Sequence, residues 1–150
     1  LEELSNDIFM YYGLGCRNVS KIYMPNGYNL DLLFNSFFNW KNVINNNAYY
    51  NNYIYNKTIY LMKGEKIFDN GFSILKESKN IGSPIGTIFY EYYNDKLKIS
   101  NHLIKENEKI QCIVSNKIVK NSIKIGTTQT PSIDDFADKV DTMSFLLKLT

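Results

Sequence analysis

Apolar side chains near the start of the chain recur at helical spacing. They are Leu4, Ile8, Phe9 and Tyr12. This spacing predicts an amphipathic helix that runs into Gly13. From Val19 to Met24 the pattern changes to the alternation of a β-strand, and a Pro-Asn-Gly turn at residues 25–27 ends it.

A second helical stripe follows the turn, and Asn29 is placed to cap its helix. The stripe consists of Leu30, Leu33, Phe34, Phe37 and Phe38 and is predicted to face a core. The next segment is rich in Asn and Tyr, which is compatible with a disordered tract. Apolar residues between positions 50 and 61 nevertheless keep helical spacing, and Gly64 supplies a stop, so a helix is the preferred interpretation.

The second half of the chain alternates short apolar runs with polar segments. Strands are predicted at Gly71–Leu75, Ile85–Tyr93 and 109–115, and helices over Asp95–Asn107 and from Ser132 onward. Strands that alternate with helices predict an α/β fold with a mainly parallel sheet. A three-layer α/β/α sandwich fits a chain of 150 residues, which is one domain in length.

Composition excludes several classes of protein. Hydrophobic residues make up 44% and charged residues 21%, as in a soluble globular domain, and no apolar run approaches the roughly 20 residues that span a bilayer. A net charge of +2 without clustered Lys and Arg argues against a nucleic-acid partner. The chain starts at Leu1 with neither an initiator methionine nor a leader, so we expect a fragment of a longer protein.

Two cysteines without a CxxC or Cys/His cluster predict neither a disulfide framework nor a zinc site, so a reducing cytoplasm is the expected compartment.

Cys16 lies in the stretch YYGLGCRNVSKIYMP, between a Gly-x-Gly turn and Arg17. The absent Cβ atoms of Gly13 and Gly15 favour close approach of a substrate, and backbone N–H groups together with Arg17 favour the thiolate. Cys16 is therefore the candidate nucleophile, and Arg17 either orients its loop or pairs with a carboxylate.

Other chemically interesting residues have simpler interpretations. His102, the only histidine, lies in a polar helix and is expected at the surface rather than as a base. Cys112 is expected to be a buried thiol, and Trp40 to belong to the core rather than to a groove for an acyl chain. The acidic residues near the C-terminus suit helix capping and a solvated face rather than a metal site; they are Asp134, Asp135, Asp138 and Asp141.

Several segments together resemble one family. GLGCRNVSKIYMP is similar to the active-site segment of the bacterial long-chain acyl-CoA reductases of the LuxC family, in the aldehyde dehydrogenase superfamily, whose Phe-x-x-x-Gly-Gln-x-Cys pattern appears as Phe9, Gly13 and Cys16. GFSIL and IGSPIGTIFYEYYND resemble two superfamily strands. TTQTPSIDDFADKVDTMSFLLKL resembles the closing segment of the reductases, with its signature at Phe136 to Thr142. The superfamily's Glu-x-Phe-Gly-Pro element is replaced here by Asn80–Pro84.

The resemblance implies a catalytic-cysteine domain over residues 1–150 with an aldehyde dehydrogenase-like fold, lacking the nucleotide-binding domain of the whole enzyme. Cys16 would accept the acyl group of a long-chain acyl-CoA or acyl-protein donor, and NADPH would reduce it to a fatty aldehyde. A homo-oligomer is also implied. Two alternatives stay open: a cysteine acyltransferase or thioesterase, which needs a histidine base, and a non-catalytic oligomerisation or interaction domain.

Overall fold

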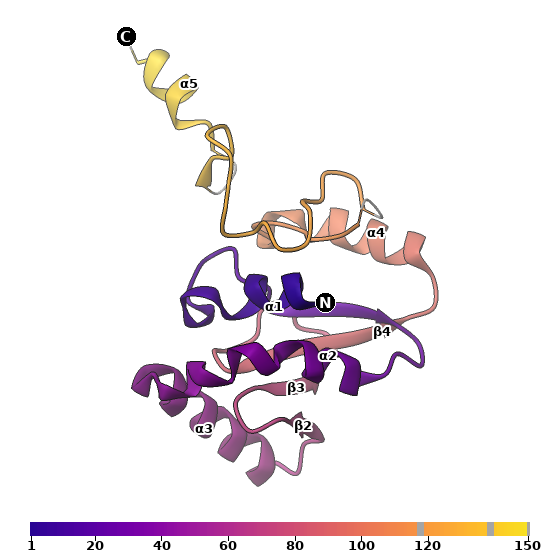
Figure 1. Ribbon diagram of the computed structural model, residues 1–150. Coiled ribbons are helices and arrows are strands. Elements are labelled where there is room, and N and C mark those ends of the chain that lie inside the picture. Colours follow the sequence, from indigo (N-terminus) through magenta and orange to yellow (C-terminus); the bar gives the residue numbers. More distant parts are fainter. Residues whose placement is uncertain (117–118, 138–139, 150) are drawn as a thin grey trace.

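The computed structural model describes residues 1–116, 119–137 and 140–149 (Figure 1). The strands are β1 (Lys21–Pro25), β2 (Ile67–Asp69), β3 (Ile74–Glu77) and β4 (Thr87–Tyr93). The α-helices are α1 (Glu2–Phe9), α2 (Leu30–Phe37), α3 (Asn47–Met62), α4 (Lys96–Lys105) and α5 (Thr142–Leu147). The 3₁₀ segments that the described residues define with both ends are η1 (Met10–Gly13), η2 (Phe38–Asn45) and η3 (Asn107–Lys109).

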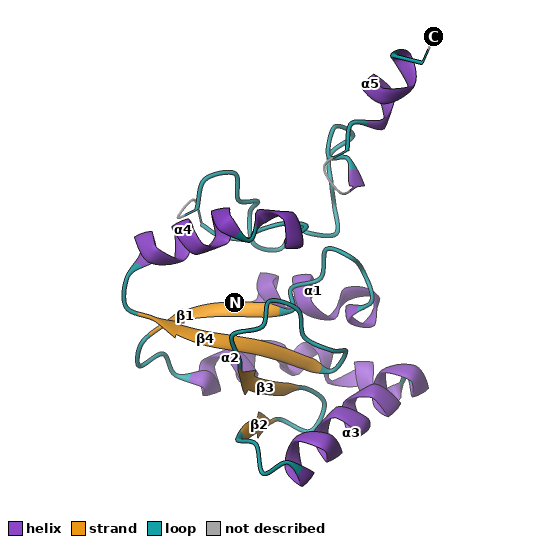
Figure 2. Cartoon of the chain, turned by 180° about the vertical axis from the view of Figure 1, so that it is seen from behind, coloured by secondary structure: helices purple, strands orange, loops and turns teal. Residues whose placement is uncertain are grey.

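The strands form one four-stranded sheet in the order β1-β4-β3-β2. β4 pairs in parallel with both β1 and β3, and β2 is antiparallel to β3. Helices α1 and α2 lie over one face of the sheet, and the loop between β3 and β4 crosses the opposite face (Figure 2). On that face the Lys21 ammonium donates to the Ser78 carbonyl at 2.6 Å. The predicted α/β class and mainly parallel sheet are confirmed.

Aromatic packing fills the core between the sheet and the two helices. The Phe9 ring lies 5.1 Å from Phe37 and 5.8 Å from Phe72, measured between ring centroids. Trp40 stacks on Phe9 at 6.2 Å and donates from Nε1 to the Asn6 side chain, so its predicted place in the core is confirmed. Phe38, predicted to share this core, is instead 60% exposed, because α2 ends at Phe37 and the tighter η2 begins there.

Side-chain caps fix the helix starts that the sequence predicts. The Asn29 side chain accepts from the Asp31 N–H at 2.8 Å, and Asp95 accepts from the Leu97 N–H at 2.9 Å. The Asn/Tyr-rich segment is helical as preferred, over α3, and Gly64 follows its end with a φ of +67°. Tyrosines on one face of α3 are buried, so packing rather than composition decides the conformation of this segment.

Two predicted elements are wrong. Residues 109–115 do not form a buried strand; the chain there follows η3 irregularly and makes one isolated bridge, between Val114 and Ile123. No helix begins at Ser132. The last helix, α5, starts ten residues later, where Asp141 caps it by accepting from the Ser144 N–H at 2.8 Å. Its apolar side chains are exposed, and it projects from the body of the molecule (Figure 1).

The strand after Gly71 begins later than predicted, and β2 was not predicted at all. The Asn70 side chain accepts from the N–H groups of Phe72 and Ser73, which holds a turn and delays β3 until Ile74.

No helix in the described part of the chain is both long and apolar enough to cross a membrane.

Gly86 provides a test of how α3 meets the sheet. Its φ is +78°, and a Cβ there would lie 2.9 Å from the Cα and Cβ of Tyr53. We expect Gly86→Ala to lower the free energy of unfolding by roughly 1–3 kcal/mol, because both backbone strain and a backbone clash oppose it.

Gly82→Ala is the matched control, since Gly82 has no positive φ and no atom within 4 Å of a new Cβ. We expect its effect to stay within about 0.5 kcal/mol. Urea unfolding followed by circular dichroism measures both variants. Equal stability of the two variants would contradict the close packing of α3 on Gly86.

Candidate functional site

Cys16 occupies a tight turn that precedes β1. The Asn18 N–H donates to the Gly15 carbonyl at 3.0 Å, which closes a turn with Cys16 and Arg17 at its centre. The Asn18 side chain also accepts from the Gly15 N–H at 2.7 Å. The Cys16 thiol is free and exposed. Two hydrogen bonds between Gly15 and Asn18 thus stabilise the turn, and Cys16 lies at its tip.

Asn18 also ties this turn to the end of α1. Its amide nitrogen lies 3.0 to 3.1 Å from the carbonyl oxygens of Asp7, Ile8 and Met10, which a helix end leaves unsatisfied. Between α1 and the turn, Tyr11, Tyr12 and Gly13 all have positive φ, at 55°, 59° and 69°. Non-glycine residues adopt that conformation only when their surroundings impose it. Asn18 supplies such an anchor, and the sequence analysis gave it no role.

Gly15 is required by packing. A Cβ at Gly15 would lie 2.7 Å from the Asn18 Oδ1 and 3.2 Å from the Gln129 Oε1. Gln129 comes from the C-terminal third of the chain, so a distant segment lies directly on the cysteine turn. The buried Nε2 of Gln129 has no hydrogen-bond partner among the described residues. It is therefore a spare amide donor beside the turn.

Arg17 connects the turn to the same distant segment. Its Nε donates to the Thr128 carbonyl at 2.8 Å, and its Nη2 lies 2.8 Å from the Asp135 carboxylate. The hydrogen bond to Asp135 raises the pKa of Arg17. Of the two roles left open by the sequence, the structure shows pairing with a carboxylate.

The buried carboxylate of Asp7 also holds the segment around Thr128 against α1. Asp7 is 1% exposed, and its oxygens accept from the Gly126 N–H at 2.6 Å, the Thr128 N–H at 3.0 Å and the Thr128 hydroxyl at 2.8 Å. This role of Asp7 was not predicted from the sequence. A signal was present, because Asp7 lies on the apolar stripe of α1, three residues after Leu4 and next to Ile8.

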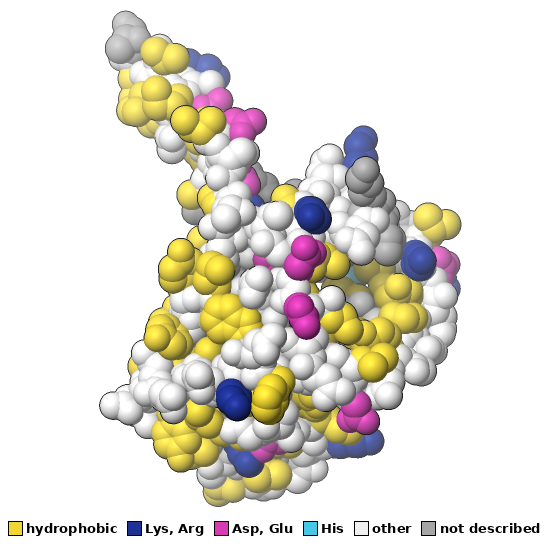
Figure 3. All heavy atoms as spheres, in the orientation of Figure 1, with side chains coloured by type: hydrophobic (Ala, Val, Ile, Leu, Met, Phe, Trp, Pro, Cys, Tyr) yellow, Lys and Arg dark blue, Asp and Glu magenta, His cyan; other side chains and the backbone are white. Residues whose placement is uncertain are grey.

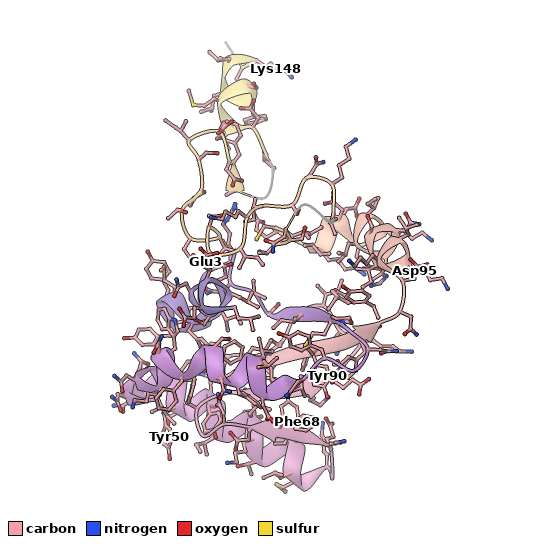
Figure 4. All side chains as sticks on the ribbon, turned by 45° about the vertical axis from the view of Figure 1, so that its right-hand side comes forward. Glu3, Tyr50, Phe68, Tyr90, Asp95 and Lys148 are labelled. Carbon is pink, nitrogen blue, oxygen red and sulfur yellow. The ribbon has the colours of Figure 1, made fainter. Side chains whose placement is uncertain are left out.

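Cys16 borders a cavity of about 900 Å³ between β1 and α4. Every residue from Arg17 to Pro25 lines it, so it runs along the edge of β1 that is not paired with β4. Figure 3 shows a hollow rimmed by hydrophobic side chains on this side of the molecule. In Figure 4 the opening between β1 and α4 extends between the labelled residues Glu3 and Asp95. A second cavity, of about 220 Å³, borders Cys16 on the side of Gly86.

Polar groups line part of the larger cavity. The Lys21 ammonium lies 2.8 Å from the Glu91 carboxylate, and the Tyr23 ring meets His102 edge-on at 6.4 Å. Burial, followed by the charges of Glu91 and Glu106, raises the pKa of Tyr23. The Tyr23 hydroxyl finds no hydrogen-bond partner in the described ranges. His102 itself is exposed, as predicted.

Cys112 lies in the irregular segment opposite β1 and is half-buried, not enclosed in a core strand as predicted. Its Sγ donates to the Arg17 carbonyl at 3.8 Å, and it borders the larger cavity together with Cys16. Burial raises the pKa of the Cys112 thiol, although the positive charge of Arg17 acts in the opposite direction. The two cysteines, distant in sequence, are therefore neighbours.

Two backbone N–H groups in the turn have no hydrogen-bond partner among the described residues. In the described part of the chain, the N–H groups of Cys16 and Arg17 make no hydrogen bond, whereas those of Gly15 and Asn18 do. Unpaired N–H groups next to a nucleophile can stabilise a negatively charged oxygen, which is what acyl transfer requires. The turn therefore combines an exposed thiol with donors for an oxyanion.

The described residues contain no group of three His, Cys, Asp or Glu side chains arranged to hold a metal ion. Of the four aspartates considered in the sequence, Asp138 lies outside the described residues, as does Lys139 within the proposed family signature. Asp135 pairs with Arg17, and Asp141 caps α5. The remaining one, Asp134, is exposed.

Fold and site together define an α/β protein with an exposed cysteine on a turn before an edge strand. Comparison with protein-family models, curated proteins and solved structures gives no match.

The surroundings of the two thiols predict unequal reactivity. We expect iodoacetamide at pH 7.5 to label Cys16 about tenfold faster than Cys112, because Cys16 is exposed whereas the half-buried Cys112 has a raised pKa. Labelling of Cys112 should keep increasing through the alkaline range. Timed alkylation with peptide mass spectrometry measures both rates. Faster labelling of Cys112 would show that the turn does not expose Cys16.

The contacts of the Asp7 carboxylate predict that its removal destabilises the fold. We expect Asp7→Ala to lower the free energy of unfolding by roughly 2 kcal/mol or more, because it leaves the donors of Gly126 and Thr128 unpaired. Amide exchange at these two residues should accelerate. Glu2→Ala, at an exposed position of the same helix, is the control and should change stability by less than about 1 kcal/mol. Unchanged amide exchange at Gly126 and Thr128 in Asp7→Ala would show that the Asp7 carboxylate does not hold these residues.

Proposed function

We propose that this chain is the catalytic-cysteine domain of a longer, cytoplasmic, NADPH-dependent long-chain acyl-CoA reductase, with Cys16 as the acyl-accepting nucleophile. The observation that carries the proposal is the Cys16 turn, where an exposed thiol lies beside two unpaired backbone N–H groups at the border of a large cavity. The resemblance of the turn and of the closing segment to the LuxC family supplies the reaction class.

The turn accounts for the first half-reaction in chemical terms. The sulfur of Cys16 attacks the thioester carbonyl of acyl-CoA, and the CoA thiol leaves with the proton, so that one thioester replaces another. The carbonyl oxygen becomes an oxyanion during this exchange. The N–H groups of Cys16 and Arg17, which have no hydrogen-bond partner among the described residues, are the donors we assign to it.

The cavity offers room for the acyl chain. Its volume of about 900 Å³ is in the range of sites that enclose small-molecule ligands. Apolar side chains from β1, α4 and the segment opposite β1 line it; they include Ile22, Met24, Ile99, Leu103, Ile110 and Ile113. A long alkyl chain attached to Cys16 can leave water there, which favours long acyl groups over short ones.

The glycine turn before Cys16 does not have the form of an NADPH-binding loop. A dinucleotide-binding loop follows a strand and presents free N–H groups to the phosphates, whereas the Gly13–Gly15 turn follows α1 and its Gly15 N–H is bound by Asn18. Reduction is therefore assigned to the longer enzyme, and the chemistry derived from this chain ends at the acylated cysteine. The proposal also places the sheet in a three-layer, aldehyde dehydrogenase-like sandwich, supported by the mainly parallel pairing of the strands.

One alternative has an observation in its favour. The exposed apolar side chains of α5, among them Phe145 and Leu147, and the unpaired edge of β1 are features of a domain that binds other subunits. This supports an interaction domain, or a homo-oligomer of the reductase. A cysteine acyltransferase or thioesterase is less well supported, because the only histidine, His102, packs against Tyr23 on the α4 side of the cavity.

The test is intact-mass analysis of the chain after incubation with a long-chain acyl-CoA over a range of pH values. We expect one acyl group per chain, retained in Cys112→Ser and lost in Cys16→Ser. Acetyl-CoA, which lacks the long alkyl chain, should acylate the protein at least about tenfold more slowly.

An adduct on Cys112 in place of Cys16 would contradict the assignment of the nucleophile, and no adduct on either cysteine would favour the interaction domain. Without its nucleotide-binding partner the chain should not oxidise NADPH in the presence of acyl-CoA. Rapid NADPH oxidation by the purified chain would contradict the division into two domains.

A further inference from the structure

We propose that Cys16 and Cys112 form a reversible intramolecular disulfide when the protein meets a peroxide, so that the pair is a redox modification site. The proposal does not rest on the reductase function, since it needs only the two thiols and their surroundings. Its consequence is general: any reaction that uses the exposed Cys16 thiol stops while the bond is present.

Proximity is the first argument. The Sγ of Cys112 lies 3.8 Å from the carbonyl oxygen of Arg17, the residue next to Cys16. Arg17 directly follows Cys16 in the turn, so the Cys112 sulfur lies beside the Cys16 turn. Both cysteines border the same cavity, and both thiols interact electrostatically with Arg17. No other cysteine is present in the chain.

The second argument is that the segment carrying Cys112 can move as far as a disulfide bond with Cys16 requires. A disulfide needs its two Cα atoms at about 4.4–6.8 Å. Cys112 belongs to neither a helix nor a strand, and the single bridge at Val114 follows it. Segments with few backbone pairings rearrange locally at low cost. The Cys16 turn, in contrast, is fixed by Asn18, so Cys112 is the partner that moves.

The two thiols have different chemical roles in this reaction. Exposed Cys16 meets the oxidant first: its sulfur attacks one peroxide oxygen, the O–O bond breaks, and Cys16 becomes a sulfenic acid while water is released. The half-buried Cys112 then attacks the sulfenic sulfur, and a second water leaves. In total, two thiols and one hydrogen peroxide give one disulfide and two waters, and a dithiol reductant reverses the change.

The test treats the folded chain, at low micromolar concentration, with a small excess of hydrogen peroxide. We expect a monomer whose mass is lower by two hydrogen atoms, a linked peptide pair containing Cys16 and Cys112, and at least a tenfold loss of Cys16 alkylation that dithiothreitol restores. Cys112→Ser should instead stop at a sulfenic acid that dimedone traps. Circular dichroism before oxidation establishes that each variant is folded.

A displaced thiol is the matched control. The double variant Cys112→Ser, Ser115→Cys keeps one cysteine in the same segment but moves it past the bridge at Val114. We expect it to form the linked peptide at least about tenfold more slowly. An equally fast link in this variant, a link only between two chains, or no link in the original protein would each overturn the proposal. None of these measurements involves acyl-CoA, so failure here is separable from failure of the proposed function.

Discussion

The buried Asp7 carboxylate joins the two ends of the chain, and the arrangement around Cys16 depends on it. Its oxygens take the N–H groups of Gly126 and Thr128 and the Thr128 hydroxyl, while its own backbone carbonyl accepts from Asn18 and Val19. A buried carboxylate is costly unless several donors surround it. Here the donors come from a segment almost 120 residues away, so satisfying Asp7 requires the C-terminal segment to lie against α1.

That attachment is what brings Arg17 and Gln129 into their observed contacts. With Thr128 held by Asp7, its carbonyl accepts from Arg17, and Asp135 comes within reach of the guanidinium. Gln129 then packs on the glycine face of the turn. The turn is thus held from two sides, by Asn18 within its own segment and by residues 126–135 from outside. Such support on both sides keeps the thiol at the surface while leaving two N–H groups unpaired.

Features that depend on a few adjacent residues followed from the sequence. The cap at Asn29, the helix start near Asp95 and the helical spacing in α3 are local, and tertiary packing did not override them. The Gly-x-Gly turn with Cys16 could be located for the same reason. The contacts of Asp7 and Asn18 could not be located, because their partners are set by the folded chain. The strand predicted over residues 109–115 is wrong for a different reason. A short apolar run does not by itself distinguish a strand from an irregular segment that lines a cavity.

The position of β1 links the fold to its chemistry. An edge strand leaves one row of backbone groups without a partner strand, which natural proteins usually cover. Here α4 and the segment with Cys112 cover that edge at a distance and leave a cavity between. Since β1 starts directly after the Cys16 turn, the open edge and the exposed thiol belong to one continuous stretch of chain. A ligand bound along the start of β1 lies next to Cys16, and the same geometry brings the Cys112 sulfur against the Arg17 carbonyl.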